Sequence, residues 1–413
     1  MTLLDAHTDL AVPGAASVTD LGEGSGPAWL DAWLSAHRDD VVAWRRTVHA
    51  HPELGRAEHR TTALVARELM AAGLEPRTLP GGTGLVCDVG YGDRCVALRA
   101  DLDALPLQEA TGLPFASTVP DVMHACGHDA HTAMLLGAGL ALASAPALPG
   151  RVRLIFQPAE EVQPGGAIDM VADGALEGVE RIFALHCDPR LEVGKLGTRV
   201  GPITSACDIV EVALTSPGGH TARPHLTADL VEAVGSLITQ LPLLLTRQVD
   251  PRSGTVLVWG AVQAGEAPNA IPQRGVLRGT LRTADRHTWG ELEGRVRAIV
   301  ETVLAPYGVG YELSYTRGVP PVVNDERSAR MLADAAVAIL GPDASTGTEQ
   351  SSGGEDFAWY LEQVPGAMAR LGVWPGEGAP MKDIHQPTFD LDERALPVGV
   401  RVLANVALAA LTD

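Results

Sequence analysis

The chain has 413 residues, 46% of them hydrophobic, and a formal net charge of −20. This length allows two domains and a large core, and the negative charge argues against nucleic acid or an anionic membrane as a partner. Five scattered cysteines offer no disulfide framework and suit a reducing compartment. We find no apolar run long enough to cross a membrane and no secretion signal. The sequence therefore predicts a cytoplasmic globular protein, with residues 1–27 flexible.

Helix-like and strand-like patterns alternate in the first half of the chain. The expected elements are helices over residues 27–50 and 61–72, strands over 84–89 and 95–99, a helix over 132–144, a strand over 152–156, a helix over 167–172 and a strand over 182–185. This alternation predicts an α/β domain with a mostly parallel sheet.

The pattern changes at about residue 205. Between there and residue 315 the order of strands and helices reads βαββαβ, which indicates an α+β insert of the split βαβ, ferredoxin-like kind. The α/β pattern then returns, with helices expected over 326–340 and 395–411. We therefore expect a catalytic domain built from residues 1–204 and 316–413, with a second domain, residues 205–315, inserted into it.

Residues 123–131, Met-His-Ala-Cys-Gly-His-Asp-Ala-His, form the most informative segment of the chain. Cys126 and His128 are two apart, so an extended backbone directs both side chains the same way. Soft ligands at the mouth of a buried helix mark a metal or catalytic site. A core thiol beside a helix capped by Asp129 is the alternative reading of the same residues.

Further polar side chains follow the expected strands. Asp101 and Asp103 follow one strand, Glu160 and Glu161 follow the next, and His186 follows a third. In mostly parallel sheets, ligands bind beyond the carboxyl ends of the strands. Taken singly, these groups also fit a loop cap, a solvated pair of glutamates and a core histidine.

The candidate metal ligands belong to loops or strand ends. They are Cys126, His128, Glu161, His186 and His385. Five ligands exceed the four that one tetrahedral zinc ion takes, so two ions with a bridging group fit better. Glu160 then remains as a general base.

Taken together, these motifs resemble those of the metal-dependent aminoacylase and carboxypeptidase family. Within that family the sequence is most similar to the amidohydrolase branch of hippurate hydrolases, bacterial N-acyl-amino-acid amidohydrolases and plant auxin-conjugate hydrolases. The resemblance runs from about Trp44 to the C-terminus. It rests on His51-Pro-Glu-Leu54, residues 99–106 and 124–131, residues 157–161, Gly219-His220, residues 269–272, residues 354–357 and residues 385–389.

The resemblance implies two divalent metal ions in the catalytic domain and an inserted domain that serves as lid and dimer interface. It implies that Cys126 bridges the ions and that His128, Glu161, His186 and His385 complete the ligand set. It further implies Glu160 as general base, Asp103 as the aspartate that supports the ligands, His220 as the group that stabilises the tetrahedral intermediate across a homodimer, and Asn269 and Arg282 as substrate contacts.

Two departures from the wider family affect these expectations. Asp101 and Cys126 stand where that family has a histidine and an aspartate, which leaves zinc, manganese, cobalt and nickel all open. The loop after Glu161 reads Val-Gln-Pro-Gly-Gly, where the branch runs straight into glycines.

The sequence thus predicts a metal-dependent hydrolase that cleaves the amide bond of N-acyl amino acids or similar amide conjugates by metal-activated water, with Glu160 as base. A dipeptidase, a carboxypeptidase or a biosynthetic deacylase would share this centre. A non-catalytic relative that binds an amide or peptide is the alternative of another class, and the presence of the base and every ligand counts against it.

Overall fold

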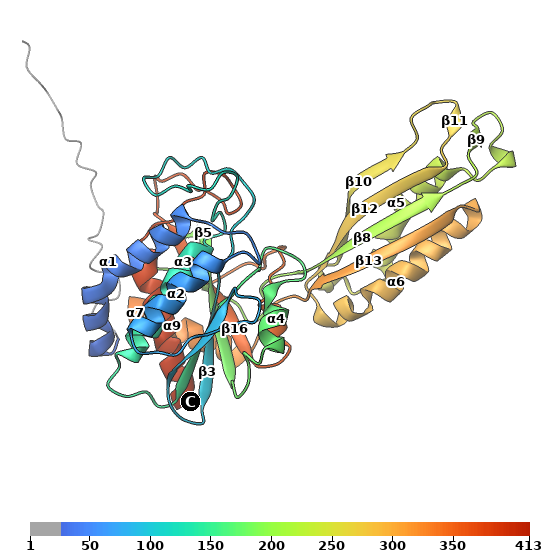
Figure 1. Cartoon of the computed structure of the whole chain (residues 1–413). Helices are drawn as coiled ribbons and strands as arrows, with labels where there is room; N and C mark the ends of the chain where they lie inside the picture. The colour runs from blue at the N-terminus through green and yellow to red at the C-terminus, as the bar shows by residue number, and fades with distance from the viewer. Residues whose placement is uncertain (1–25) are drawn as a thin grey trace, which may run out of the picture.

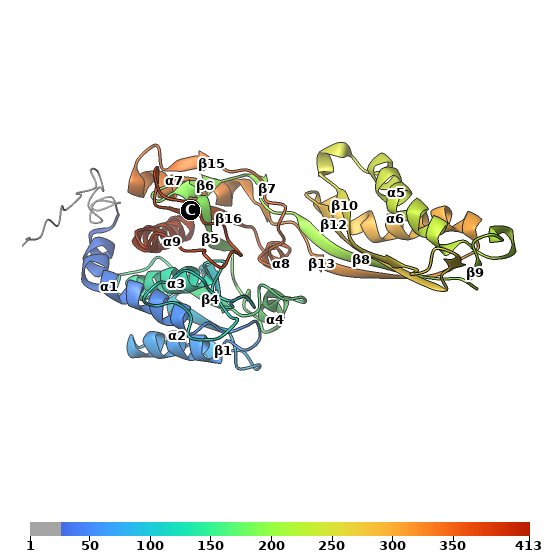
Figure 2. The same ribbon diagram turned by 90° about the horizontal axis from the view of Figure 1, so that it is seen from above.

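The structure is a computed structural model that describes residues 26–413. The expectations of flexibility and of a missing secretion signal fall almost wholly on residues 1–25 and lie outside the described residues. Figures 1 and 2 show two bodies, one built on a large sheet and one elongated body built on a smaller sheet. The strands β8 and β13 connect them, so the second body is an insert in the sequence of the first.

The large sheet has eight strands in the order β1-β2-β4-β3-β5-β16-β6-β15. They are β1 (Arg77–Thr78), β2 (Leu85–Gly90), β3 (Cys95–Asp101), β4 (Arg151–Gln157), β5 (Arg181–Glu192), β6 (Leu196–Thr198), β15 (Ser345–Gly347) and β16 (Gly366–Trp374). The central strands β4, β3, β5 and β16 are mutually parallel, and β2 and β6 pair antiparallel to them. The mostly parallel sheet is therefore confirmed.

Helices cover both faces of this sheet. One face carries α1 (Ala28–Ala50), α2 (His59–Ala71), α3 (His128–Ala143), α7 (Glu326–Leu340) and α9 (Ala395–Thr412), and the other carries α4 (Gly166–Ala172) and α8 (Ala358–Leu361). Every residue of β3 is buried. Leu98 belongs to the hydrophobic core on the face covered by α1, α2, α3, α7 and α9, and its neighbour Ala97 belongs to the core on the face covered by α4 and α8. A strand covered on both faces needs this continuous apolar run rather than an alternating one.

The insert is a four-stranded antiparallel sheet in the order β10-β12-β8-β13. Its elements are β8 (Ala206–Thr215), α5 (Leu230–Gln248), β10 (Val256–Ala264), β12 (Arg274–Thr283), α6 (Arg286–Leu304) and β13 (Gly310–Val319). Both helices lie on the same face of the sheet (Figure 2). This order and this layering confirm the ferredoxin-like fold.

Small elements complete the described chain. They are the pair β7 (Gly201–Pro202) and β14 (Val323–Asn324), the pair β9 (Gly219–His220) and β11 (Ala270–Ile271), and the short 3-10 helices Pro224–Leu226, Pro251–Ser253 and Ala305–Tyr307. The β9–β11 pair lies at the end of the insert farthest from the body built on the large sheet (Figures 1 and 2).

Four sequence expectations are wrong in detail. Helix α3 begins at His128 rather than residue 132, because Gly127 takes a left-handed conformation with φ of 87° and ends the preceding loop. Asp129 makes no cap hydrogen bond there. His186 lies inside β5 rather than after it, because β5 extends to Glu192 along its parallel partner β16.

The fourth correction concerns apolar length. By length and composition alone, α5 and α9 could each cross a membrane, so the expectation that no run is long enough is wrong. The most apolar window of α9 is 72% buried, which is typical of a core helix. That of α5 is only 33% buried, although its buried leucines pack into the core of the insert.

Candidate metal centre and active-site cleft

Cys126 is the common member of the candidate ligand cluster. Its Sγ lies 3.5 Å from Nε2 of His186 and 3.4 Å from Nε2 of His385. The same nitrogen of His385 lies 3.3 Å from Oε1 of Glu161. The ligand atoms of Cys126, His128 and His186 lie within 4.8 Å of one another, as do those of Cys126, Glu161 and His385. Cys126 thus belongs to two adjoining groups, as a bridging ligand would.

Hydrogen bonds to the backbone orient the histidines toward the cluster. His128 donates from Nδ1 to the carbonyl of Asp103 at 2.9 Å, and His186 donates from Nδ1 to the carbonyl of Cys187 at 2.8 Å. Both rings therefore present an unprotonated Nε2 when neutral, which is the form that binds metal.

The donor set fits divalent ions. Nε2 of His128 is fully buried and has no hydrogen-bond partner among residues 26–413, which is a costly arrangement without a bound group. Burial, followed by the charges of Glu161 and Glu160, raises the pKa of the Cys126 thiol well above its ordinary value. A cation among these groups would offset both penalties.

Asp103 fixes the loop that carries both glutamates. Its Oδ1 accepts the N–H of Glu160 at 3.0 Å and its Oδ2 accepts the N–H of Glu161 at 2.9 Å. The carboxylate is buried. Ala159, just before the pair, has a positive φ of 56°, so the chain turns sharply out of β4.

Glu160 lies between the candidate ligands and a buried charge cluster around Arg99. Its carboxylate lies within 4.8 Å of those of Glu355 and Asp356, and Arg99 donates to both of these at 3.0 Å. Burial and then the charges of Glu355 and Glu161 raise the pKa of Glu160 well above its ordinary value. A carboxyl group with a raised pKa is suited to taking up and returning a proton.

Asp101 faces the cluster but already has partners. It accepts Nη1 of Arg99 and Nδ1 of His131, both at 2.6 Å. Nε2 of His131 in turn accepts the N–H of Cys187 at 2.9 Å, so both ring nitrogens are used. Burial opposes ionisation, yet His128, His131 and Arg99 hold the pKa of Asp101 well below its usual range. Asp101 and His131 therefore act as supports of the site.

A second network holds the start of α3. Oδ2 of Asp129 accepts Nε of Arg45 and Nδ1 of His49, both at 2.8 Å, and Nε2 of His49 lies 3.3 Å from Glu109. This network fixes the helix turn that presents His128. The alternative reading of Asp129 as a helix cap is wrong, because its side chain is used here.

The cluster opens into a cavity of about 390 Å³, called here the catalytic cavity. Its lining includes Cys126, Glu160, His385 and, from the insert, Arg282. Arg282 also donates to the carbonyl of Ser352 in the catalytic body. The structure therefore brings Arg282 to the site, as expected of a substrate contact.

His220 and Asn269 do not reach this cavity within one chain. His220 lies in β9 and Asn269 directly precedes β11, at the far tip of the insert (Figures 1 and 2). His220 is exposed, and the carbonyl of Asn269 accepts the N–H of Thr221 at 3.2 Å. Only a second copy of the chain, or a large movement of the insert, could bring these side chains to a metal centre.

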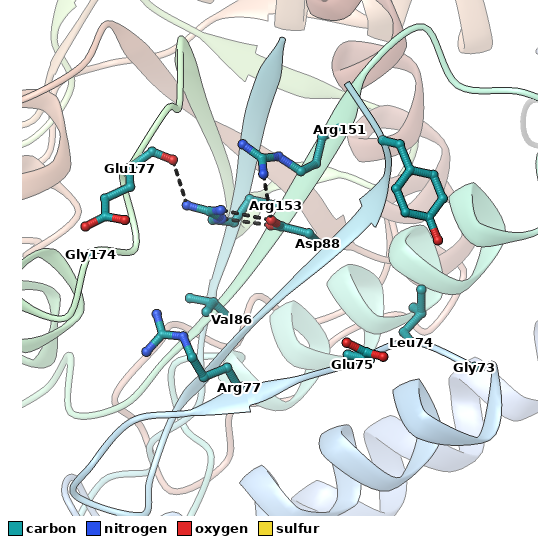
Figure 3. Close-up of a pocket in the computed structure, with 12 residues that line it drawn as sticks. Gly73, Leu74, Glu75, Arg77, Val86, Asp88, Arg151, Arg153, Gly174 and Glu177 are labelled. Atoms are coloured by element: carbon teal, nitrogen blue, oxygen red, sulfur yellow. Dashed lines mark hydrogen bonds and ion pairs between the residues drawn. The ribbon is translucent and has the colours of Figure 1, made fainter. Parts of the chain in front are cut away.

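Another cavity, of about 630 Å³, lies where β2 and β4 pair (Figure 3). Arg153 donates to both carboxylate oxygens of Asp88, at 2.7 and 2.8 Å, and to the carbonyl of Glu177 at 2.9 Å. The lining of this cavity contains no histidine or cysteine. The Arg153–Asp88 pair is therefore engaged, and the cavity lacks the histidine and cysteine side chains that gather around Cys126.

Sequence reasoning missed the buried partners. The sequence marks Arg99 only as the first residue of the motif over residues 99–106. Its hydrogen bonds to Glu355 and Asp356 join residues that are 256 and 257 positions apart. Arg370 was missed as well, although an arginine within the otherwise apolar strand β16 was a visible signal. Burial, and then the charge of Arg370, keep the pKa of His186 well below its usual range.

This fold and this cluster define a hydrolase of the metallopeptidase type. The chain belongs to peptidase family M20/M25/M40, whose sequence profile matches residues 97–409. A solved structure, the YXEP protein of Bacillus subtilis, described as a dinuclear metal-binding peptidase of family M20, is 35% identical with a TM-score of 0.80, over 92% of this chain and 99% of that one.

Two curated relatives are also similar. An N-acetyl-L-cysteine deacetylase of Bacillus subtilis is 37% identical over 88% of this chain and 86% of the relative. A Rhodococcus jostii protein named as a glutamate–cysteine ligase is 58% identical over 95% of this chain, yet the chain spans only 49% of that protein's length. Because this chain spans about half of that protein, its name is not carried over to this chain.

Proposed function

We propose that the protein hydrolyses the amide bond of N-acyl amino acids or similar amide conjugates with the help of two divalent metal ions. The observation that carries this proposal is the position of Glu160, which lines the catalytic cavity and lies within 4.8 Å of the candidate ligands His128 and Glu161. The deacetylase name of a relative that matches most of the chain supports the reaction class.

Cys126, His128, Glu161, His186 and His385 would hold the ions. When bound, divalent ions supply Lewis-acid activation of water and of an amide carbonyl. Glu160 takes a proton from the attacking water and returns it to the leaving amine, which its position next to Glu161 and its raised pKa support. Arg282 binds the carboxylate of the amino acid from the wall formed by the insert.

The tip of the insert acts on a second copy of the chain in this proposal. His220 is exposed, and the N–H of Ala222, which donates to its Nδ1, is the only hydrogen-bond partner of its side chain among residues 26–413. In a homodimer it would enter the partner's cavity and donate to the developing oxyanion, a contribution worth about 3 kcal/mol by analogy with single oxyanion donors. Asn269, near His220 on the paired strand, would contact the substrate from the same side.

The test is release of free amino acid from a panel of N-acetyl and longer N-acyl amino acids and dipeptides, with the protein reconstituted separately with zinc, manganese, cobalt and nickel. Wild-type protein should hydrolyse N-acyl amino acids, and Glu160→Gln should keep bound metal while losing at least about 100-fold in kcat. Hydrolysis of dipeptides alone would move the assignment to the peptidase alternative. Turnover of Glu160→Gln at the wild-type rate would remove Glu160 from the mechanism.

A further inference from the structure

A second cavity adjoins the catalytic cavity and is called here the side recess. Its volume is about 350 Å³, and its walls are residues 187–191 at the end of β5, residues 347–352, and Asp383 with Ile384. Ser351, Arg370 and Ile384 line both cavities, so the two cavities adjoin at these residues. A substrate held at the metal cluster can therefore extend into the side recess.

Arg370 lies at the junction of the two cavities because of its register in the sheet. It pairs with His186 across the parallel strands β16 and β5. Side chains of directly paired residues point to the same face of a sheet, so Arg370 shares the face of a candidate metal ligand. On its other side, Arg370 pairs with Gly197 of β6. A Cβ at Gly197 would lie 3.3 Å from Cβ of Arg370 and 2.9 Å from Cβ of Thr348, so the glycine leaves room for the arginine.

The guanidinium group of Arg370 has no hydrogen bond or ion pair with any residue of the described chain, 26–413. By contrast, the buried Arg99 forms ion pairs with three carboxylates of the site. The aspartates of the side recess have other contacts. Asp188 accepts the N–H of Arg190 at 2.9 Å, and Asp383 lies 3.9 Å from the guanidinium of Arg190.

A partly enclosed arginine with free donors is suited to one kind of ligand. Guanidinium presents a planar set of N–H donors that matches both oxygens of a carboxylate. The catalytic cavity thus has arginine on two walls, with Arg282 from the insert and Arg370 from the sheet. If Arg282 binds the α-carboxylate of the amino acid, Arg370 remains for a second anionic group.

We propose that Arg370 binds a second carboxylate of the substrate in the side recess, so that the enzyme selects amides carrying two carboxylates. Such amides are N-acyl derivatives of acidic amino acids, or amino acids acylated by a dicarboxylic acid. This inference rests on the proposed hydrolase function and assigns Arg370 a role in specificity.

The test compares substrate pairs that differ only in charge. N-acetylglutamate is paired with N-acetylglutamine. N-glutarylalanine is paired with the N-acylalanine in which the terminal carboxylate of the glutaryl group is replaced by a carboxamide. The wild type should favour the charged member of at least one pair. In Arg370→Met that preference, the ratio of the two kcat/KM values, should fall roughly 10–100-fold, mainly through KM, because one charge-assisted contact is lost. Arg370→Lys should restore part of it.

Arg190→Met is the matched control, because Arg190 lines the same recess but is 68% exposed. It should change the ratio by less than about 2-fold, since contacts of exposed charges are weak. Metal content of each variant is measured alongside, because Arg370 neighbours His186. A readout without turnover comes from calorimetric titration of glutarate and its monoamide into the purified protein, where only glutarate should bind and Arg370→Met should abolish that binding.

The outcomes separate the two proposals. Wild-type hydrolysis of both members of every pair without preference, or an equal loss on both members in Arg370→Met, would overturn the role of Arg370 and leave the hydrolase function standing. A wild type inactive on the whole panel would overturn the proposed function. In that case, glutarate binding that depends on Arg370 would still support the recess as a carboxylate site, and absence of binding would overturn it.

Discussion

Asp103→Asn is the substitution that most directly probes how the loop of Glu160 and Glu161 is held. The carboxylate of Asp103 is only 1% exposed and accepts the two successive N–H groups of that loop at 3.0 and 2.9 Å. Asparagine can accept only one of them, and its amide nitrogen would face the other donor. The change is nearly isosteric, so the cavity keeps its shape.

The expected cost follows from those two contacts. One charge-assisted hydrogen bond, worth about 1.5–3 kcal/mol, is lost and one buried N–H is left unpaired. Because the loop positions both Glu161 and Glu160, we expect metal affinity to fall about 10–100-fold. We expect kcat/KM at saturating metal to fall about 10–100-fold as well, through misplacement of Glu160.

The assay is elemental analysis after dialysis against a fixed low metal concentration, followed by kcat/KM at saturating metal. Asp325→Asn is the matched control. Its carboxylate also accepts a backbone N–H, that of Ser328 at 2.9 Å, but at the start of α7 rather than at the cluster. The control should lose some stability and no metal. Wild-type metal content and turnover in Asp103→Asn would refute the reasoning.

Three further predictions concern other parts of the structure. Burial opposes protonation of His49, but Asp129 and Glu109 raise its pKa to about 9 from 6.5. This gives up to about 3 kcal/mol of stability, present below about pH 6.5 and lost as pH rises through about 9. Urea unfolding should therefore show His49→Gln destabilised more at about pH 6 than at about pH 9.5, and an equal deficit at both would contradict the assignment. Gly166→Ala would place a Cβ 1.9 Å from the carbonyl oxygen of Pro158, so it should displace the loop of Glu160 and lower metal content, which elemental analysis would show. His220→Ala should lower kcat about 100-fold with unchanged metal content. If the tip serves the partner, a mixed dimer with a Glu160→Gln chain should regain about half of wild-type activity, because one of its two sites then has both residues intact.

The sequence indicated which side chains gather around Cys126 because the strands that carry or precede them are parallel neighbours. Residues placed after β3 and β4 and within β5 meet at one edge of a parallel sheet, and Cys126 and His128 enter from the start of α3. Alternation of apolar runs was enough to find these strands, and a helix start was missed by four residues only because Gly127 allows an early turn.

The remainder depended on contacts that no local pattern records. Arg99 and Glu355 meet across 256 residues, so their bond follows from tertiary packing alone. The distance of His220 from the cavity depends on how far β8 and β13 extend from the catalytic body (Figure 1). The free guanidinium of Arg370 depends on the register of β16 with β5 and β6, which the strand sequence does not specify.

The proposed amide hydrolysis depends on two metal ions held by the cluster around Cys126. It is tested by titrating chelator-treated protein with one divalent ion at a time, with bound metal and turnover of an N-acyl amino acid followed in the same samples. We expect about two ions per chain, turnover that follows their occupancy, and loss of both in Cys126→Ala. Full turnover of the metal-free protein, or full occupancy in Cys126→Ala, would contradict it.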